Sequence, residues 1–122
     1  MQQILLDTNV IIYHVNGDRV IEFDPYTTFV STITVFELLQ YSAITRQEEK
    51  AIKAILEICN IIPVNTAIAE RAAIFARKHN IGSMDMLIAA TAIELGIPLM
   101  TYNTKDFKKI PFLKMGNELS FN

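Results

Sequence analysis

Residues 83–101, "SMDMLIAATAIELGIPLMT", decide the fold because they join a helix directly to a strand. Residues 83–95 have the apolar content and spacing of a buried helix. Gly96 suits the left-handed position that ends a helix, and Pro98 prevents the helix from continuing. "PLMT" then has the composition of a short buried strand. A helix followed at once by such a strand is typical of α/β folds.

The rest of the chain continues this alternation, without internal repeats or long linkers. The order predicts an α/β protein with a central, mostly parallel sheet flanked by helices. Thr66 is expected to cap the helix that it begins, and a further strand at "FLKM" is only weakly indicated. The other expected strands are residues 3–7, 27–32, 61–64 and 98–101, and the expected helices are residues 8–15, 34–44, 47–59, 66–79 and 83–95.

Length and composition limit the classes of protein to consider. The 122 residues suit a single compact domain spanning 1–122. Because 51% of the residues are hydrophobic and 20% are charged, a sizeable core is possible and disorder is not expected. The net charge of −2 gives no general attraction to nucleic acid, so RNA binding would need a local basic patch.

The compartment can be inferred from three features of the sequence. The single cysteine, Cys59, cannot form an internal disulfide and fits a reducing environment, where it is expected in the core. The amino terminus "MQQILLDTN" has no basic residue and does not resemble a signal peptide. No apolar stretch approaches the ~20 residues of a membrane helix. We therefore expect a soluble, cytoplasmic protein without a membrane partner.

Three acidic residues fall at the starts of expected helices. Asp7 ends a strand and precedes a helix, while Glu37 and Asp85 lie in the first turns of two others. In a parallel α/β sheet, the carboxyl ends of strands and the amino ends of helices meet at one edge, where ligands bind. Asp106 follows the last strand by a few residues and can reach the same edge, although alone it would be an ordinary loop acid. The acids are therefore predicted to converge.

The first three acids also have a purely structural explanation. Thr34 and Glu37 have the spacing of a capping box, in which Glu37 binds the backbone at Thr34. Asp7 can cap the helix that follows it. Ser83 can cap the helix of residues 83–95 while Asp85 complements its dipole.

Capping alone explains Asp7 and Asp85 poorly. At helical spacing, Asp85 shares a small, apolar face with Ile88 and Ala89, which suits close packing on a sheet. An ionised carboxylate at such a position is costly unless it is paired or binds a metal. No basic residue lies within one turn of Asp85, and residues 1–18 around Asp7 contain no lysine or arginine. Both acids are therefore better explained by function.

Carboxylates gathered without histidine or cysteine partners are typical of a site for a hard cation. Oxygen ligands suit Mg²⁺ or Mn²⁺ rather than zinc, and His14 and His79 lack the pairing of metal ligands. One or two ions would position a phosphodiester, generate a hydroxide nucleophile and neutralise the leaving oxygen. The sequence leaves the choice between one ion and two open.

Four segments of the chain, "LLDTNVII", "STITVFELL", "MDMLIAATA" and "LMTYNTKDF", resemble the motif blocks of PIN domains in order and approximate spacing. More specifically, they are similar to those of the toxin ribonucleases of VapBC toxin–antitoxin modules. The resemblance covers about residues 2–110. It implies a PIN-like fold and a Mg²⁺- or Mn²⁺-dependent endoribonuclease that acts as a toxin. Carried over, Asp7, Glu37 and Asp85 coordinate the metal, with Asp106 as a more variable fourth ligand.

The resemblance also implies supporting residues and shows departures from the family pattern. Asn9 and Thr101 match polar positions that support the site by hydrogen bonds. Many relatives carry an acid where this chain has Asn103, so either Asp106 or Asn103 completes the site. "ELLQYS" lacks a glycine that often follows the glutamate, and "GNELSFN" lacks the proline–tryptophan ending of some toxins. These departures leave the three main acids intact.

The segment "KDFKKIPFLK" is the best candidate for RNA contact because its lysines adjoin Asp106. Its basic side chains can hold phosphates while the metal offsets repulsion between RNA and the acids. Two other basic groups are more simply explained as solvated helix faces. The lysines of the segment are Lys105, Lys108, Lys109 and Lys114; the other groups are Arg46, Lys50 and Lys53, and Arg71, Arg77 and Lys78.

Partner surfaces are indicated by a surplus of apolar residues between positions 15 and 41, which exceeds what one small core needs. The resemblance implies that helices in this part of the chain form a homodimer and bind a cognate antitoxin. A segment of that antitoxin is expected to extend toward the acids.

Other functions are compatible with parts of the pattern. A non-catalytic PIN-like binding module would keep the fold without the metal, and a solitary PIN nuclease in RNA processing would lack an antitoxin. Aspartyl-phosphate proteins also place an aspartate after a buried strand beside Mg²⁺. The phosphatase type needs a second aspartate where this chain has Asn9, and a receiver domain needs an aspartate after a mid-chain strand, which "NIIPVN" does not offer.

Overall fold

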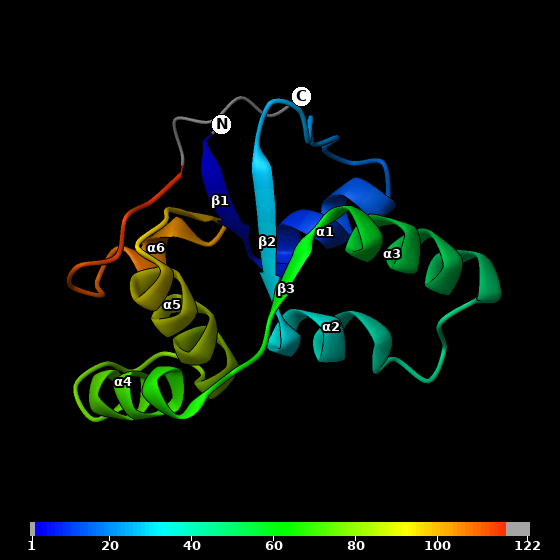
Figure 1. The fold of residues 1–122 in the computed structure, drawn as a ribbon. Helices are drawn as coiled ribbons and strands as arrows, with labels where there is room; N and C mark the ends of the chain where they lie inside the picture. Colours follow the sequence, from blue (N-terminus) through cyan, green and yellow to red (C-terminus); the bar gives the residue numbers. More distant parts are fainter. Residues whose placement is uncertain (1, 117–122) are drawn as a thin grey trace.

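A parallel sheet forms the centre of the protein (Figure 1). The computed structural model describes residues 2–116, and the sheet order within them is β3-β2-β1-β4. Every strand pairing in this sheet is parallel, which confirms the predicted fold class. The strands are β1 (Gln3–Leu6), β2 (Thr27–Ser31), β3 (Asn60–Ile62) and β4 (Leu99–Met100).

Helices cover both faces of this sheet (Figure 1). The first three, α1 to α3, lie on one side and pack on one apolar cluster, whereas α4 to α6 pack on a second cluster on the other side. The helices are α1 (Thr8–Val15), α2 (Thr32–Leu39), α3 (Arg46–Ile58), α4 (Thr66–Ala76), α5 (Ser83–Leu95) and α6 (Thr104–Phe107).

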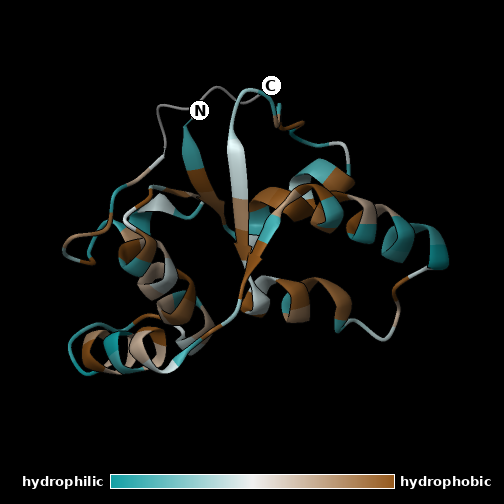
Figure 2. Cartoon of the chain, viewed as in Figure 1, coloured by the Kyte–Doolittle hydropathy of each residue, from teal (hydrophilic) through white to brown (hydrophobic). Residues whose placement is uncertain are grey.

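The two clusters follow from the alternation of side chains along β1. Ile4 and Leu6 belong to the cluster under α1 and α3, and Leu5 belongs to the cluster under α5. All three side chains are fully buried, as expected for a parallel strand covered on both faces. Figure 2 shows hydrophobic residues along the strands and on the inner faces of the helices, with hydrophilic residues on the outside of α3.

Helix α2 differs from the prediction at both ends. It begins at Thr32 rather than Thr34, because Ser31 at the end of β2 caps it by accepting a 3.0 Å hydrogen bond from the Ile33 amide. It ends at Leu39 rather than near residue 44. The residues that follow lead to α3, where Thr45 and a glutamate form a capping box. Glu37 therefore lies in the second turn of α2.

Two predicted helix caps are wrong, and one helix end is confirmed. Asn65, not Thr66, caps α4, since its side chain accepts from the Ile68 amide at 2.9 Å. Ser83 does not cap α5, whose amino end at Gly82 has no side-chain hydrogen bond. Gly96 ends α5 in the left-handed conformation, with φ of 68°.

Two smaller predictions concern residues at the edges of the core. The expected strand at "FLKM" is reduced to an isolated bridge between Met115 and Leu99. Cys59 is buried, as predicted for a core residue. Of the helices in the described part of the chain, none combines the length and apolar character needed to cross a bilayer.

Candidate active site

Asp7 lies at the carboxyl end of β1, where the sheet meets the amino ends of the helices. Because Leu6 pairs with Met100 in the parallel ladder, Asp7 and Thr101 emerge from adjacent strands at the same level. Thr101 Oγ1 donates to Asp7 Oδ2 at 2.7 Å, and the Thr8 amide donates to Oδ1 at 2.8 Å. Asp7 thus caps α1, as expected, yet only 4% of it is exposed.

Glu37 extends from α2 toward the start of α1. The Thr8 hydroxyl donates to Glu37 Oε1 at 2.6 Å and lies 3.0 Å from the hydroxyl of Thr34. The capping-box explanation of Glu37 is therefore wrong: Ser31 caps α2, and Thr34 is a buried residue that contacts Thr8. Glu37 is held beside Asp7 by the residue that follows Asp7 in the chain.

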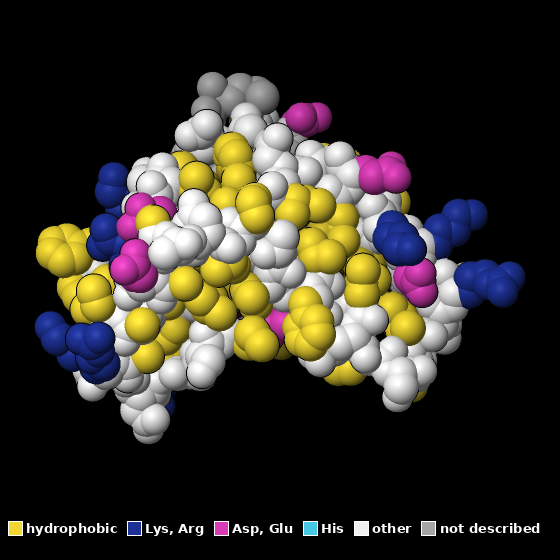
Figure 3. All heavy atoms as spheres, turned by 60° about the horizontal axis from the view of Figure 1, so that its bottom comes forward, with side chains coloured by type: hydrophobic (Ala, Val, Ile, Leu, Met, Phe, Trp, Pro, Cys, Tyr) yellow, Lys and Arg dark blue, Asp and Glu magenta, His cyan; other side chains and the backbone are white. Residues whose placement is uncertain are grey.

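Asp85 lies in the first turn of α5, on the opposite side of the sheet from α2. The face behind it is small and tightly packed, since Ile88, Ala89 and Ala92 are fully buried. Figure 3 looks toward the edge at which the strands end, and an acidic side chain is visible between hydrophobic side chains near the middle.

The electrostatic state of Asp7 reflects its surroundings. Burial is the main cause that raises the pKa of its carboxyl from 3.8 to about 6. Hydrogen bonds from Thr101 and Thr8 act against this rise. The negative charges of Asp85 and Glu37 add to it, which shows that both acids act on the same carboxylate.

The pKa of Asp85 is also raised, by burial first and then by the charges of Glu37 and Asp106. The effects on Asp7 and Asp85 together involve all four predicted acids at one edge of the sheet. The acids do not form a finished coordination site, however: within residues 2–116, no three histidine, cysteine or acidic side chains are grouped closely enough to hold an ion. Asp7, Glu37, Asp85 and Asp106 are therefore neighbours whose side chains would have to move to share one ligand.

The chemistry of this donor set fits a hard dication. The donors are carboxylate oxygens, without a thiolate or imidazole among them, and such ligands suit Mg²⁺ or Mn²⁺. Lys53–Glu49 and Arg71–Glu94 are ion pairs away from the four acids, so neither reduces the negative charge at this edge. A bound cation would relieve the repulsion that raises the pKa of Asp7.

The predicted supporting residues lie beside the acids. Asn9 Oδ1 accepts a long, 3.4 Å hydrogen bond from the Tyr102 amide, which joins α1 to the end of β4. The Asn103 amide donates to Thr101 Oγ1 at 3.0 Å, and its side-chain nitrogen donates to Asp106 Oδ2 at 3.2 Å. Asn103 therefore orients Asp106 and is linked to Asp7 through Thr101.

Several residues beside the acids were not predicted. Thr8 could have been noticed as the middle residue of "DTN", whereas Thr34 was considered only as a cap. Arg19 stacks on Tyr102, with its guanidinium carbon 4.5 Å from the ring centroid, and Tyr13 packs edge-on to the same ring. These residues are far apart in the sequence, so no local pattern indicates their contact.

The basic residues near Asp106 are exposed. Lys105 lies in α6, and Lys108 and Lys109 follow it on the surface, whereas the Lys114 carbonyl accepts from the Leu99 amide at the amino end of β4. Arg71 is paired with Glu94, which weakens the case for a basic strip on α4. The exposed residues of the two groups are Lys105, Lys108, Lys109 and Lys114, and Arg77 and Lys78.

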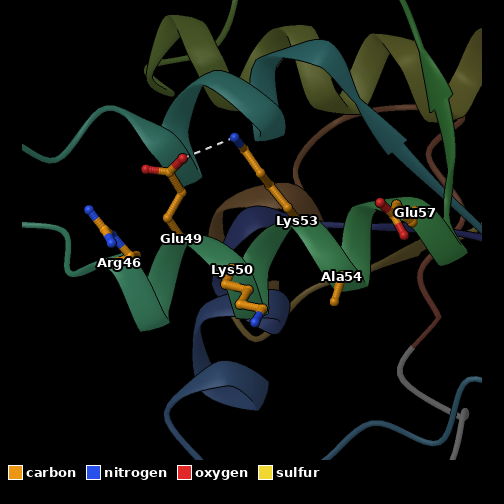
Figure 4. Close-up of a pocket in the computed structure, with 6 residues that line it drawn as sticks. All are labelled: Arg46, Glu49, Lys50, Lys53, Ala54 and Glu57. Atoms are coloured by element: carbon orange, nitrogen blue, oxygen red, sulfur yellow. Dashed lines mark ion pairs between the residues drawn. The ribbon is translucent and has the colours of Figure 1, made fainter.

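The strip on α3 is better explained as a solvated face. Arg46, Lys50 and Lys53 line a shallow hollow of about 660 Å³ along a single helix (Figure 4). Glu49 lies in the same hollow and pairs with Lys53 at 2.9 Å. A surface built from one helix, with charges of both signs, has neither the depth nor the charge of a nucleic-acid site.

Comparison with known proteins adds to this geometry. A family profile described as "PIN domain" matches residues 4–113. The curated "Ribonuclease VapC1" of Rickettsia felis is 34% identical, and the alignment covers 92% of this chain and 93% of that protein. A toxin–antitoxin complex from Klebsiella pneumoniae superposes with a TM-score of 0.73 and 31% identity, covering 89% of this chain and 93% of that one. VapBC-1 from nontypeable Haemophilus influenzae gives a TM-score of 0.78 and 26% identity, covering 93% and 96%.

Proposed function

The chain belongs to the PIN domain family, among the VapC ribonucleases, and from that premise we propose that it is a Mg²⁺- or Mn²⁺-dependent endoribonuclease. We further propose that it acts as the toxin of a toxin–antitoxin pair. The observation that carries the proposal is the convergence of Asp7, Glu37, Asp85 and Asp106 at the carboxyl edge of the sheet, where burial first, and then the neighbouring charges, raise the pKa of Asp7 and Asp85.

In the proposed mechanism Asp7, Glu37, Asp85 and Asp106 would hold one or two cations. Mg²⁺ or Mn²⁺ bound there supplies water activation and charge neutralisation for the hydrolysis of an RNA phosphodiester. The protein's own contribution is orientation. Thr8 and Thr101 fix the two oxygens of Asp7. Thr8 also holds Glu37, and Asn103 holds Asp106, so three of the carboxylates are directed by hydrogen bonds before a ligand arrives.

Substrate binding needs positive charge beside these acids, because the chain carries a net charge of −2. We assign this role to Lys105, Lys108 and Lys109, which are exposed on and after α6, the helix that carries Asp106. Lysines here can bind phosphates on either side of the scissile bond, while the bound cation reduces the repulsion between RNA and the acids.

We propose that the antitoxin docks on the surface formed by α1, α2 and α3. An apolar groove of about 330 Å³ lies between α1, α2 and α3, and its rim includes Tyr41, which is 57% exposed. Aromatic residues of this kind are enriched at protein interfaces. The groove is lined by Ile12, Val15, Asn16, Leu38, Tyr41, Ala43, Ile44, Glu48 and Ile52.

We also propose a homodimer. Phe36 and Met84 are 54% and 40% exposed, and they directly precede Glu37 and Asp85 in the chain. Figure 3 shows a band of hydrophobic side chains across this face. A second copy that covers these residues would remove apolar surface from water and enclose the acids.

The proposal is tested by incubating purified protein with total RNA and Mn²⁺ and mapping the cleavage sites. We expect cleavage that requires the cation and that is lost in Asp7→Asn and Asp85→Asn. Glu57→Gln removes an exposed acid on α3 and serves as the control, with wild-type activity expected. Wild-type protein that cuts no RNA, or Asn variants that cut as well as wild type, would rule out the proposed mechanism.

The alternative of a non-catalytic binding module is favoured by one observation, namely that the acids are not grouped into a finished metal site. Isothermal titration with Mn²⁺ separates the two proposals. A nuclease should bind Mn²⁺ in a way that depends on Asp7 and Asp85, whereas a binding module should not. The alternative of a solitary nuclease predicts that no small gene for a DNA-binding antitoxin adjoins this one.

A further inference from the structure

Phe112 is the most exposed large hydrophobic side chain in the described part of the chain, with 82% of its surface accessible. Its backbone has a φ of 69°, in the left-handed region that bulky residues rarely adopt. An aromatic side chain that is both exposed and held in an unfavourable backbone conformation does not contribute to the core. Such outliers are common where a residue is presented to a ligand.

The loop that carries Phe112 is fixed at both ends. On one side, Phe107 and Ile110 are buried, and the Ile110 amide donates to the Phe107 carbonyl at 3.0 Å. On the other side, the Leu99 amide donates to the Lys114 carbonyl at 2.8 Å, next to the bridge between β4 and Met115. The aromatic ring is therefore presented by an anchored loop, which lowers the entropy lost when a ligand binds.

A hollow of about 490 Å³ lies beside this ring, between the loop, α4 and the end of α5. Its volume is in the range of small-ligand sites, and its wall includes Ile74, which is 48% exposed. Polar side chains also line it, among them Lys78 and His79, while the paired Arg71 and Glu94 neutralise each other. Glu70 lines the hollow too, so it offers an apolar wall with charges of both signs at its rim to a flat, partly polar group.

The charge around the loop indicates the kind of ligand. Lys108, Lys109 and Lys114 are exposed within a few residues of Phe112, and none of them takes part in the ion pairs formed among residues 2–116. Lysine is depleted in protein–protein interfaces, so this surface does not suit a protein partner. An aromatic side chain among lysines is the usual arrangement for binding single-stranded nucleic acid.

We propose that Phe112 stacks on an unpaired base of the RNA substrate, while Lys108 and Lys109 bind neighbouring phosphates. The inference rests on the proposed nuclease function and names a residue outside the acids that would bind a base of its substrate. Phe112 lies six positions after Asp106, so their Cα atoms lie within about 20 Å. At about 3.4 Å per stacked nucleotide, the bound base lies no more than about six nucleotides from the acids.

The chain contains no tryptophan, so Phe112→Trp places a single fluorescent probe at this position. In an Asp7→Asn background, which prevents cleavage, we expect a single-stranded RNA oligonucleotide to quench its fluorescence. An abasic oligonucleotide of the same length keeps the phosphates but has no base to stack, and it should quench little. Tyr41→Trp in the same background is the control, because Tyr41 is an exposed aromatic residue away from the lysines. Equal quenching by both oligonucleotides, or in both variants, would overturn the proposal.

A second variant distinguishes an effect on RNA binding from an effect on folding. Phe112→Gly removes the ring and tolerates the positive φ, so thermal stability should stay close to wild type. Its affinity for single-stranded RNA should fall roughly tenfold, and Phe112→Tyr should restore it.

If the wild type cleaves RNA and Phe112→Gly binds and cleaves equally well, the stacking role is wrong while the nuclease function stands. If the wild type does not cleave but the introduced indole is quenched as expected, the nuclease function fails and base stacking stands. A fluorescence change that depends on protein concentration without RNA would assign the surface to self-association and overturn the proposal.

Discussion

Replacing Asp7 by asparagine is expected to stabilise the metal-free protein while it abolishes the proposed activity. The carboxylate is almost fully buried and is subject to repulsion from Glu37 and Asp85. Asparagine has nearly the same shape and is as good a helix cap as aspartate. It can still accept from the Thr8 amide, and its side-chain nitrogen can donate to the Thr101 hydroxyl. The substitution therefore removes the charge and keeps both hydrogen-bonded contacts.

The expected size follows from the pKa of Asp7, which is about 6 in the folded protein and 3.8 in the reference state. Between these values the folded state binds more protons than the unfolded state, so the free energy of unfolding falls as the pH rises. One pKa unit corresponds to 1.36 kcal/mol, so the full cost above pH 7 is about 3 kcal/mol. Asparagine avoids this cost, and near pH 4, where the folded-state carboxyl is protonated, the two proteins should differ little.

The assay is urea unfolding in the presence of EDTA at a series of pH values from 4 to 8. The difference between Asp7→Asn and wild type isolates this carboxyl, since all other ionisable groups are common to both proteins. We expect the variant to be more stable by up to about 3 kcal/mol at pH 7.5, with the difference growing between pH 4 and 6. Glu57→Gln, which removes an exposed acid, should show no such pH-dependent difference.

A variant that is less stable than wild type at pH 7.5, or a difference that does not change with pH, would refute this reasoning. Adding Mn²⁺ extends the test. An ion that binds only the folded state at 100 times its dissociation constant stabilises it by about 2.7 kcal/mol, which is close to the cost at Asp7. Mn²⁺ should therefore raise the stability of the wild type toward that of the variant, and have a smaller effect on the variant.

Three further predictions concern single residues. Thr101→Val removes a hydrogen bond that lowers the pKa of Asp7, so the pH at which the metal-free protein loses stability should rise in the same urea titration; an unchanged midpoint would contradict the role of Thr101. Lys109→Ala should weaken single-stranded RNA binding at low salt and reduce the slope of log affinity against log salt by about 0.7, while a slope equal to wild type would exclude a phosphate contact. Gly96→Ala places a side chain in a left-handed backbone position that has open space around it, so backbone strain alone should lower the free energy of unfolding by about 1 kcal/mol in chemical denaturation. An unchanged free energy of unfolding would show that the helix end adapts.

Much of the fold could be predicted because it depends on local patterns. The short apolar segments and helix periods gave the order of strands and helices, and Gly96 marked the end of α5 correctly. Helix starts were harder, since several polar residues near each one were able to cap. Ser31 rather than Thr34 caps α2, and Asn65 rather than Thr66 caps α4. Local sequence does not distinguish adjacent candidates whose backbone conformations are set by the strand or loop before them.

In the candidate site, too, some features could be predicted from the sequence and others could not. The edge rule for parallel sheets was enough to place the acids together, because it depends only on the order of strands and helices. The hydrogen bonds that orient the acids were not predictable. Thr8 and Glu37 are 29 residues apart, and Asp7 and Thr101 are 94 apart. The capping-box motif misled for the same reason, since the partner of Glu37 lies on another helix.

The acids come from both helical layers, which has a consequence for how the site could close. Glu37 belongs to α2 on one side of the sheet, whereas Asp85 belongs to α5 on the other, and Asp7 lies between them at the end of β1. Their separation is therefore set by how the two layers pack on the sheet, not by the geometry of one loop. Repulsion between these charges opposes close packing at this edge, and a dication would reverse that force. Asp7 and Asp85, whose pKa values are raised by burial and by neighbouring charges, thus carry a local cost to folding that a bound cation would offset, and local rules for stability are expected to fail at sites of this kind.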